Sequence, residues 1–405
     1  MKKFSKFISL ALILLIMSGL VFSAFAETND LSGTTINVYN WGQYISDGTD
    51  GYIDVNKAFT EQTGIKVNYL TFDSNESLYT KLKTGGAEYD VIIPSDYMIH
   101  RLIDEGLIQK INFDNIPNYK YISDAYKNTA YDPTNEYSVP YTWGAVGIIY
   151  NDKFVNEADL GGWDLLWNDK YAGKILMFDN PRDSFGAAEL YLGYSLNSED
   201  EAEITAAADL LTKQKPLLQS YVMDQIYGQM THEEAWIAPY YAGDYLQMSA
   251  ENEHLKFFYP KEGFNLFIDA CCIPTSSKNT AAAEAYINFL CNPEIMAENL
   301  SFLGYSAPSE EAKALMDPEV SGNEIAYPAE DVLARGEAFL NLSPESTKLM
   351  DSLWLKVKTD SSQSNENESG IYIGLAAAVG AIVVFFFVRS QAQRKKKAAR
   401  ESSKR

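Results

Sequence analysis

Short apolar stretches alternate with amphipathic segments along the first part of the chain. Apolar residues gather in three stretches of strand length, at 36–39, 66–71 and 91–93. Between them lie two amphipathic segments of helical length that end next to glycines, at 53–62 and 74–84. Because strands and helices alternate, the pattern predicts a βαβαβ arrangement with a parallel sheet.

The alternation continues further along, and the total length bears on the number of domains. Two more strands are predicted at 148–150 and 174–178. Ser198 and Glu201 have the spacing of a helix-capping box, which predicts a helix running to about residue 213. Roughly 330 residues lie between 27 and 358, more than a single hydrophobic core usually holds. The sequence therefore predicts an α/β protein with two domains.

Two long apolar runs lie near the ends of the chain. The first, 7–22, follows three lysines and precedes a small-x-small site, so residues 1–26 are predicted to be a signal peptide cleaved before Glu27. An uncleaved N-terminal helix is the alternative. The second run, 371–388, has 18 residues without a charge and is predicted to be a transmembrane helix, with a buried core helix as the alternative.

Charge is distributed unevenly and orients the predicted membrane helix. Residues 389–405 carry eight Lys or Arg and one Glu, which places this tail on the cytoplasmic side and the body outside. The polar stretch 359–370 is predicted to be a flexible spacer. Residues 27–388 hold 22 basic and 54 acidic residues. So acidic a body repels nucleic acid and favours cationic partners.

The sequence lacks the motifs of catalysis and of cofactor binding. His100, His232 and His254 are scattered, and His232 has no second histidine at the spacing of a zinc-protease helix. No Walker loop, G-x-G-x-x-G or G-x-S-x-G motif follows a predicted strand. We therefore expect a protein that is not an enzyme and that uses no cofactor and no metal.

The cysteines do not describe a disulfide framework. Cys271 and Cys272 are adjacent, and Cys291 stands alone. Buried free thiols on a strand and a helix are expected. One disulfide between Cys291 and either Cys271 or Cys272 is the alternative. No cysteine lies near the predicted cleavage site, so we expect no lipid attachment there.

Seven strings of residues form a series along the chain. They are Y-N-W-G-Q-Y (39–44), F-D-S-N-E-S-L-Y-T-K-L (72–82), Y-D-V-I-I-P-S-D-Y (89–97), S-V-P-Y-T-W-G (138–144), W-D-L-L-W-N-D-K-Y-A-G-K (163–174), P-Y-Y-A-G-D-Y (239–245) and L-G-Y-S-A-P (303–308). Each string is a weak signal, but the ordered series is specific. It resembles the bacterial spermidine/putrescine-binding proteins of ABC transporters, over about residues 34–358.

The resemblance implies a fold and a division of the chain. The fold would be that of periplasmic binding proteins, with two α/β lobes that close on a ligand in a cleft. The chain would cross between the lobes near 137–141 and 269–274. Lobe 1 would comprise about 35–137 and 275–327, and lobe 2 about 138–274 and 328–358.

The resemblance also implies which residues contact the ligand. They are Trp41, Gln43, Tyr44, Ser95, Tyr97, Asp183, Tyr240, Phe267, Asp269 and Tyr305. Asp269 stands out on its own as a lone charge in the apolar run 267–273, because a buried carboxylate is costly unless a cation meets it. For Asp183, the neighbouring Arg182 is a rival partner.

The implied function is the capture of a polyamine, spermidine or putrescine, and its delivery to the permease subunits of an ABC transporter. The ammonium groups of such a ligand need carboxylates, and its methylenes need apolar or aromatic walls. We expect a monomer held at the cytoplasmic membrane by 371–388, with its binding body extracytoplasmic. A membrane-anchored polyamine sensor without a transport role is the alternative. Departures from the family pattern, such as Gln43 and Phe267, leave the choice between spermidine and putrescine open.

Overall fold

The structure of the protein is a computed structural model that describes residues 31–86 and 88–359. The chain forms two compact units. Unit 1 comprises the described residues up to Gly144 together with Phe267–Tyr327, and unit 2 comprises Ala145–Leu266 together with the described residues from Pro328 onward. The sequence analysis places the corresponding boundaries at 137/138, 274/275 and 327/328. The first two boundaries of the structure instead fall inside strands β5 (Ser138–Asn151) and β10 (Phe264–Pro274).

The sheet of unit 1 has the parallel arrangement that the sequence predicts. Strand β1 (Thr35–Trp41) lies between β2 (Lys66–Phe72) and β3 (Val91–Ile92) and runs parallel to both. The unit 1 part of β10 continues the sheet, because it pairs antiparallel with β3 and with β4 (Ile108–Gln109). The predicted βαβαβ unit is confirmed, and β1 lies at its centre.

Unit 1 contains helices of different length. They are α2 (Val55–Thr63), α3 (Asn75–Thr84), α4 (Asp96–Asp104), α9 (Thr280–Leu290), α10 (Pro293–Leu303), α11 (Glu310–Lys313) and α12 (Pro318–Ser321). Helix α2 ends at Gly64, whose φ of 73° is the left-handed conformation that glycine adopts without strain. Helix α3 begins after Ser74, whose hydroxyl accepts from the amide of Ser77 in a capping box.

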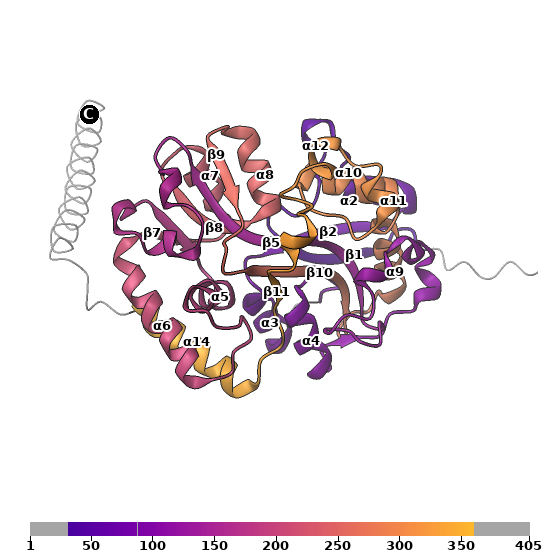
Figure 1. Ribbon diagram of the computed structural model, residues 1–405. Coiled ribbons are helices and arrows are strands. Elements are labelled where there is room, and N and C mark those ends of the chain that lie inside the picture. Colours follow the sequence, from indigo (N-terminus) through magenta and orange to yellow (C-terminus); the bar gives the residue numbers. More distant parts are fainter. Residues whose placement is uncertain (1–30, 87, 360–405) are drawn as a thin grey trace, which may run out of the picture. The chain divides into compact units, whose positions relative to one another are not determined.

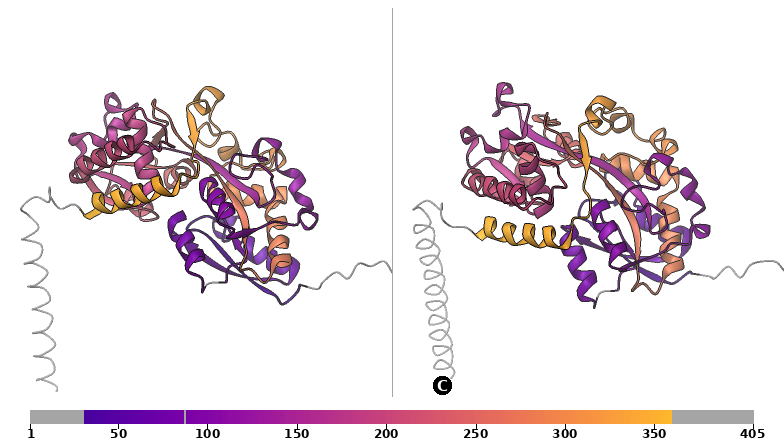
Figure 2. Two further views of the ribbon diagram at one scale, coloured as in Figure 1. Left: turned by 90° about the horizontal axis from the view of Figure 1, so that it is seen from below. Right: turned by 60° about the horizontal axis from the view of Figure 1, so that its bottom comes forward.

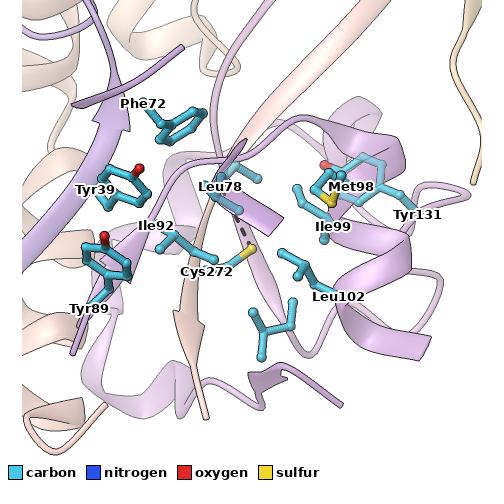
Figure 3. Packing of buried hydrophobic residues seen from close by; sticks show 12 residues of the cluster. Tyr39, Phe72, Leu78, Tyr89, Ile92, Met98, Ile99, Leu102, Tyr131 and Cys272 are labelled. Carbon is cyan, nitrogen blue, oxygen red and sulfur yellow. Dashed lines mark hydrogen bonds between the residues drawn. The ribbon is translucent and has the colours of Figure 1, made fainter. Parts of the chain in front are cut away.

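The core of unit 1 fills the space between its sheet and helix α4. Figure 3 shows the rings of Tyr39 and Tyr89 side by side, and their centroids lie 4.2 Å apart at an interplanar angle of 3°. Met98 and Leu102 of α4 are buried in the same cluster at a spacing of one helical turn. This core fixes the first turn of α4 next to the end of β3.

The strands of unit 2 pair with one another. Strand β6 (Ile175–Phe178) runs parallel to β7 (Leu218–Val222) and β8 (Ile237–Tyr241). The unit 2 part of β5 pairs antiparallel with β8 and with β9 (Leu255–Phe258). The first residues of β10 pair with β11 (Gly336–Ala338). The strands predicted at 148–150 and 174–178 are therefore confirmed as parts of β5 and β6.

Helices surround the sheet of unit 2. They are α5 (Pro181–Leu192), α6 (Glu201–Gln214), α7 (Ile226–Thr231), α8 (Ala242–Glu251), α13 (Glu330–Leu333) and α14 (Pro344–Thr359). Figures 1 and 2 show α14 lying alongside α6. The predicted cap of α6 is wrong, because Asp200 accepts from the amide of Ala202, whereas the Ser198 hydroxyl donates to the side chain of Glu203.

Several further expectations concern termini and thiols. The three cysteines are buried and free in the structure. The predicted signal peptide, 1–26, and the predicted transmembrane helix, 371–388, lie outside the described residues, as do the basic tail and nearly all of the spacer. Within 31–86 and 88–359, no helix combines the length and apolar character that a membrane span requires.

Candidate functional site

The candidate residues of unit 1 lie at the carboxyl ends of its parallel strands. Trp41 is the last residue of β1, and Gln43 and Tyr44 follow in the next loop. Ser95 is the N-cap of α4 directly after β3, and Tyr97 lies in the first turn of that helix. Loops at the carboxyl ends of parallel strands are where open α/β sheets bind ligands.

Asp269 contacts two other candidate residues of unit 1. Its side chain is buried, with 4% of the residue exposed. The hydroxyl of Tyr44 donates to Asp269 Oδ2 at 2.6 Å, and the main chains of Ser95 and Asp269 pair as an antiparallel β-bridge. The structure thus brings together three predicted site residues from three separate parts of the sequence.

Aromatic rings surround the Tyr44–Asp269 pair. The ring centroid of Tyr305 lies 5.0 Å from that of Tyr44 in an edge-to-face arrangement and 6.3 Å from that of Phe267. Tyr305 follows helix α10, which ends at Gly304 with a left-handed φ of 74°. Phe267 packs directly on Gly144, where a Cβ atom would lie only 2.7 Å from its ring. A carboxylate walled by aromatic rings is an environment suited to an organic ammonium ion.

The remaining candidates of unit 1 have different environments. The ring of Trp41 packs against Phe72 at 4.5 Å, and its indole Nε1 is buried without a hydrogen-bond partner in the part of the chain that the structure describes. Gln43 is exposed and adopts a left-handed φ of 51°. The structure therefore places Trp41 partly against the core and leaves the Gln43 side chain at the surface.

Glu76 contacts one of these candidate residues and is not assigned by the sequence analysis. The hydroxyl of Tyr97 donates to Glu76 Oε1 at 2.9 Å, and the amide of Ser95 donates to the side chain of the adjacent Asn75 at 3.2 Å. Both acceptors belong to the start of α3, within the string F-D-S-N-E-S. Helix α3 thus brings a second carboxylate to the ends of the strands, and a search for acids in the quoted strings would have found it.

Asp183 forms a separate polar cluster in unit 2. It lies in the first turn of α5 after the N-cap Asn180, whose side-chain nitrogen donates to Asp183 Oδ2 at 2.8 Å. The Tyr241 hydroxyl donates to the same oxygen at 2.7 Å. The pKa of Asp183 is raised above its ordinary value, because the effect of burial outweighs these two hydrogen bonds and the charge of Arg182, which lower it. The Arg182 guanidinium also donates to the carbonyl oxygens of two leucines, at 3.1 and 3.2 Å.

Tyr240 and Tyr241 are neighbours on β8 with different roles. Tyr240 is buried and stacks on Phe178 at 5.6 Å, while Tyr241 bonds to Asp183. The ring of Tyr241 also contacts Phe178, at 5.4 Å, and lies 4.9 Å from the ring of Tyr240, so the two tyrosines differ in their bond to Asp183 and not in the ring they pack on. Tyr241 is a further candidate that the sequence analysis does not name, although both tyrosines stand in the string P-Y-Y-A-G-D-Y.

The electrostatics of the unit 2 cluster favour a positive ligand group. Burial raises the pKa of the Tyr240 hydroxyl well above its ordinary value, and the charges of Asp244, Asp224 and Asp183 raise it further. The Tyr227 hydroxyl donates to the buried Asp244. Across the residues that the structure describes, no group of three or more His, Cys, Asp or Glu is arranged to hold a metal ion.

Comparison with known proteins gives a consistent result. Residues 55–328 match the family model described as bacterial extracellular solute-binding protein. The spermidine/putrescine-binding periplasmic protein of Salmonella typhimurium is 34% identical over 317 residues, which cover 78% of this chain and 88% of the relative. A putrescine-binding periplasmic protein of Pseudomonas aeruginosa is 32% identical over 377 residues, covering 89% of this chain and 99% of the relative.

Solved structures agree with the sequence relatives. A putative spermidine/putrescine ABC transporter protein from Listeria monocytogenes superimposes with a TM-score of 0.76 at 36% identity, covering 80% of this chain and 99% of the other. The spermidine/putrescine ABC transporter substrate-binding protein of Streptococcus pneumoniae gives a TM-score of 0.67 at 37% identity, with 80% and 98% covered. These likenesses extend over both units.

Proposed function

Because the chain belongs to the family of bacterial extracellular solute-binding proteins, we propose that it captures a linear polyamine outside the cytoplasm and delivers it to an ABC transporter permease. Spermidine and putrescine are the proposed ligands, since the relatives from Salmonella typhimurium and Streptococcus pneumoniae bear both names. The observation that carries the proposal is the buried carboxylate of Asp269, which accepts from Tyr44 among aromatic rings.

The chemistry of a polyamine assigns a role to each part of the two clusters. An ammonium group that leaves water needs a carboxylate to offset its desolvation, and each cluster taken by itself offers one, Asp269 in unit 1 and Asp183 in unit 2. Methylene segments need apolar surfaces, and aromatic faces also attract the neighbouring charge. Trp41, Phe267 and Tyr305 supply such surfaces. Hydrogen bonds from Tyr44 and Tyr241 hold the two carboxylates in place.

Glu76 and Tyr97 extend the proposed site of unit 1. Their hydrogen bond lies near the carboxyl ends of the parallel strands, as Asp269 does. Ser95 links the two, because its main chain pairs with Asp269 and it precedes Tyr97 at the start of α4. Glu76 adds a carboxylate where the uncharged Gln43, a departure from the family pattern, supplies none. We propose that Glu76 helps to neutralise a positive group of the ligand near Tyr97.

The proposal includes the location of the protein. The apolar run 371–388 has the length of a membrane span and is followed by a basic tail, so we propose that it anchors the body at the outer face of the cytoplasmic membrane. Residues 1–26 have the pattern of a signal peptide that would direct export. A tether keeps a binding protein near its permease at an effective concentration of roughly millimolar.

A thermal unfolding panel tests the proposed ligand class. The purified full-length chain is melted with spermidine, putrescine or cadaverine, and with two controls: butylamine, which has a single ammonium group, and lysine, which has a carboxylate beside one of its two ammonium groups. A ligand present at about 100 times its Kd stabilises the folded state by about 2.7 kcal/mol. We expect the polyamines to raise the melting temperature and the controls to leave it unchanged. Equal shifts with butylamine, or no shift with any polyamine, would rule out the proposed ligand class.

A further inference from the structure

A buried polar network lies beneath the loop that carries Tyr44. The carbonyl oxygen of Tyr44 accepts two hydrogen bonds, from the side-chain amide of Asn40 at 3.2 Å and from the hydroxyl of Tyr141 at 2.8 Å. Asn40 belongs to β1 and Tyr141 to the unit 1 part of β5, and both side chains are buried. The main chain at Tyr44 is therefore fixed by two strands of the sheet.

Asn299 of helix α10 completes this network. Its side-chain nitrogen donates to the Tyr141 hydroxyl at 2.7 Å, and its Oδ1 accepts from the amide of Ser46 at 2.9 Å. Only 1% of Asn299 is exposed. Burial raises the pKa of the Tyr141 hydroxyl well above its ordinary value, so this group stays protonated and donates to Tyr44 at all physiological pH values.

We propose that Tyr141 and Asn299 are positioning residues for the ligand, which they do not touch. They hold the main chain of residues 44–46 and thereby keep the Tyr44 hydroxyl on Asp269 Oδ2. The inference rests on the proposed function and deepens it. Ligand affinity depends on preorganised contacts, because a loop that must be ordered on binding uses part of the interaction free energy for that ordering.

The geometry supports a directed role. The Tyr141 hydroxyl accepts from Asn299 and donates to Tyr44, so it links α10 to the loop in one chain of hydrogen bonds. The Tyr44 ring also touches the Tyr141 ring, with centroids 5.7 Å apart at 60°. The effect of the Tyr141 hydroxyl on the ligand therefore passes through Tyr44 and its bond to Asp269.

A buried tyrosine elsewhere in unit 1 offers a matched control. Tyr286 is fully buried, and its hydroxyl donates to the side chain of Asn56 at 2.8 Å. Tyr286→Phe removes one buried hydroxyl that makes one hydrogen bond, to Asn56 of helix α2 and not to the loop that holds Tyr44. Tyr141→Phe removes a hydroxyl that makes two hydrogen bonds, so it should cost more stability, and the comparison between the variants uses their effect on the Kd of the folded protein.

A double-mutant cycle on the full-length chain tests the inference, with the Kd for spermidine measured by calorimetry. Tyr141→Phe should weaken binding roughly 3- to 10-fold, and Tyr286→Phe by less than about twofold. In a Tyr44→Phe background, Tyr141→Phe should change the Kd by less than about twofold, because the hydroxyl it positions is gone.

The outcomes separate this inference from the proposed function. Wild-type protein that binds no polyamine would refute the function and, with it, any positioning role. Wild-type binding that Tyr141→Phe leaves unchanged, or weakens as much in the Tyr44→Phe background as alone, would overturn the positioning role only. Amide hydrogen exchange of the unliganded variants provides a second measurement. Exchange at residues 42–46 should increase in Tyr141→Phe and stay unchanged in Tyr286→Phe, and equal exchange in both would contradict the inference.

Discussion

Glu189→Gln should remove a large part of the pH dependence of stability of this protein. Glu189 lies on α5 with no exposed surface, and neither carboxyl oxygen has a hydrogen-bond partner among the described residues. Burial raises the pKa of Glu189 to about 8. The charge of Arg182 lowers it, and the charges of Glu337 and Glu203 raise it. At neutral pH the folded protein therefore holds a proton that the unfolded chain releases.

The sign and size of the effect follow from these two states. The unfolded carboxyl has the ordinary pKa of 4.5, so the folded state binds more protons between about pH 4.5 and pH 8. The contribution of Glu189 to the free energy of unfolding is fully present below pH 4.5. It falls by about 1.4 kcal/mol per pH unit up to about pH 8, where the folded carboxyl ionises. Between pH 5 and pH 9 the wild-type chain should lose about 4 kcal/mol that Glu189→Gln does not lose.

The assay is urea unfolding followed by tryptophan fluorescence at several pH values. The comparison uses the change of each protein with pH, because a buried glutamine amide adds a cost of its own that does not depend on pH. Glu284→Gln is a suitable control, since this buried carboxyl accepts from the amide of Asn112 and the side chain of Asn115. That variant should destabilise the protein. Parallel pH profiles for wild type and Glu189→Gln would refute the reasoning.

Three further predictions concern the ligand and the membrane. Asp269→Asn should weaken polyamine binding by more than 100-fold, because removing one charge of a desolvated pair costs roughly 3 to 5 kcal/mol; calorimetry that finds a Kd within threefold of wild type would exclude Asp269 from the site. Tyr241→Phe should weaken binding several-fold while Tyr240→Phe has a smaller effect, since only Tyr241 bonds to Asp183; the reverse order in calorimetry would argue against this assignment. Protease treatment of intact cells should release the acidic body and leave a basic fragment with the membrane, whereas extraction of the full-length protein by carbonate would show that 371–388 does not span it.

Local signals predicted the elements of the sheet well because each signal lies within a few residues. Alternating apolar stretches specified the parallel strands of unit 1, and the glycines after 53–62 and 74–84 marked the ends of α2 and α3. The N-cap residue was harder to predict where two neighbouring side chains could both cap the same helix. Both Ser198 and Asp200 can cap α6, and the hydrogen bond of Ser198 to Glu203 leaves the cap to Asp200.

The candidate site depended more on tertiary structure. The lone charge of Asp269 in an apolar run was visible in the sequence, but its partner Tyr44 lies 225 residues away. Choosing between Tyr240 and Tyr241 requires knowing which hydroxyl reaches Asp183, and two adjacent tyrosines in one string do not specify this. Asn299 lies 253 residues after Ser46 in the sequence, and no local pattern links the two residues.

Isothermal titration of the purified full-length chain with spermidine and putrescine tests the central claim most directly. The account predicts saturable binding of one polyamine per chain, competition between the two ligands, and loss of the signal in Asp269→Asn protein that remains folded. A folded wild-type chain that gives no saturable heat with either polyamine, or that binds them equally well after Asp269→Asn, would contradict it.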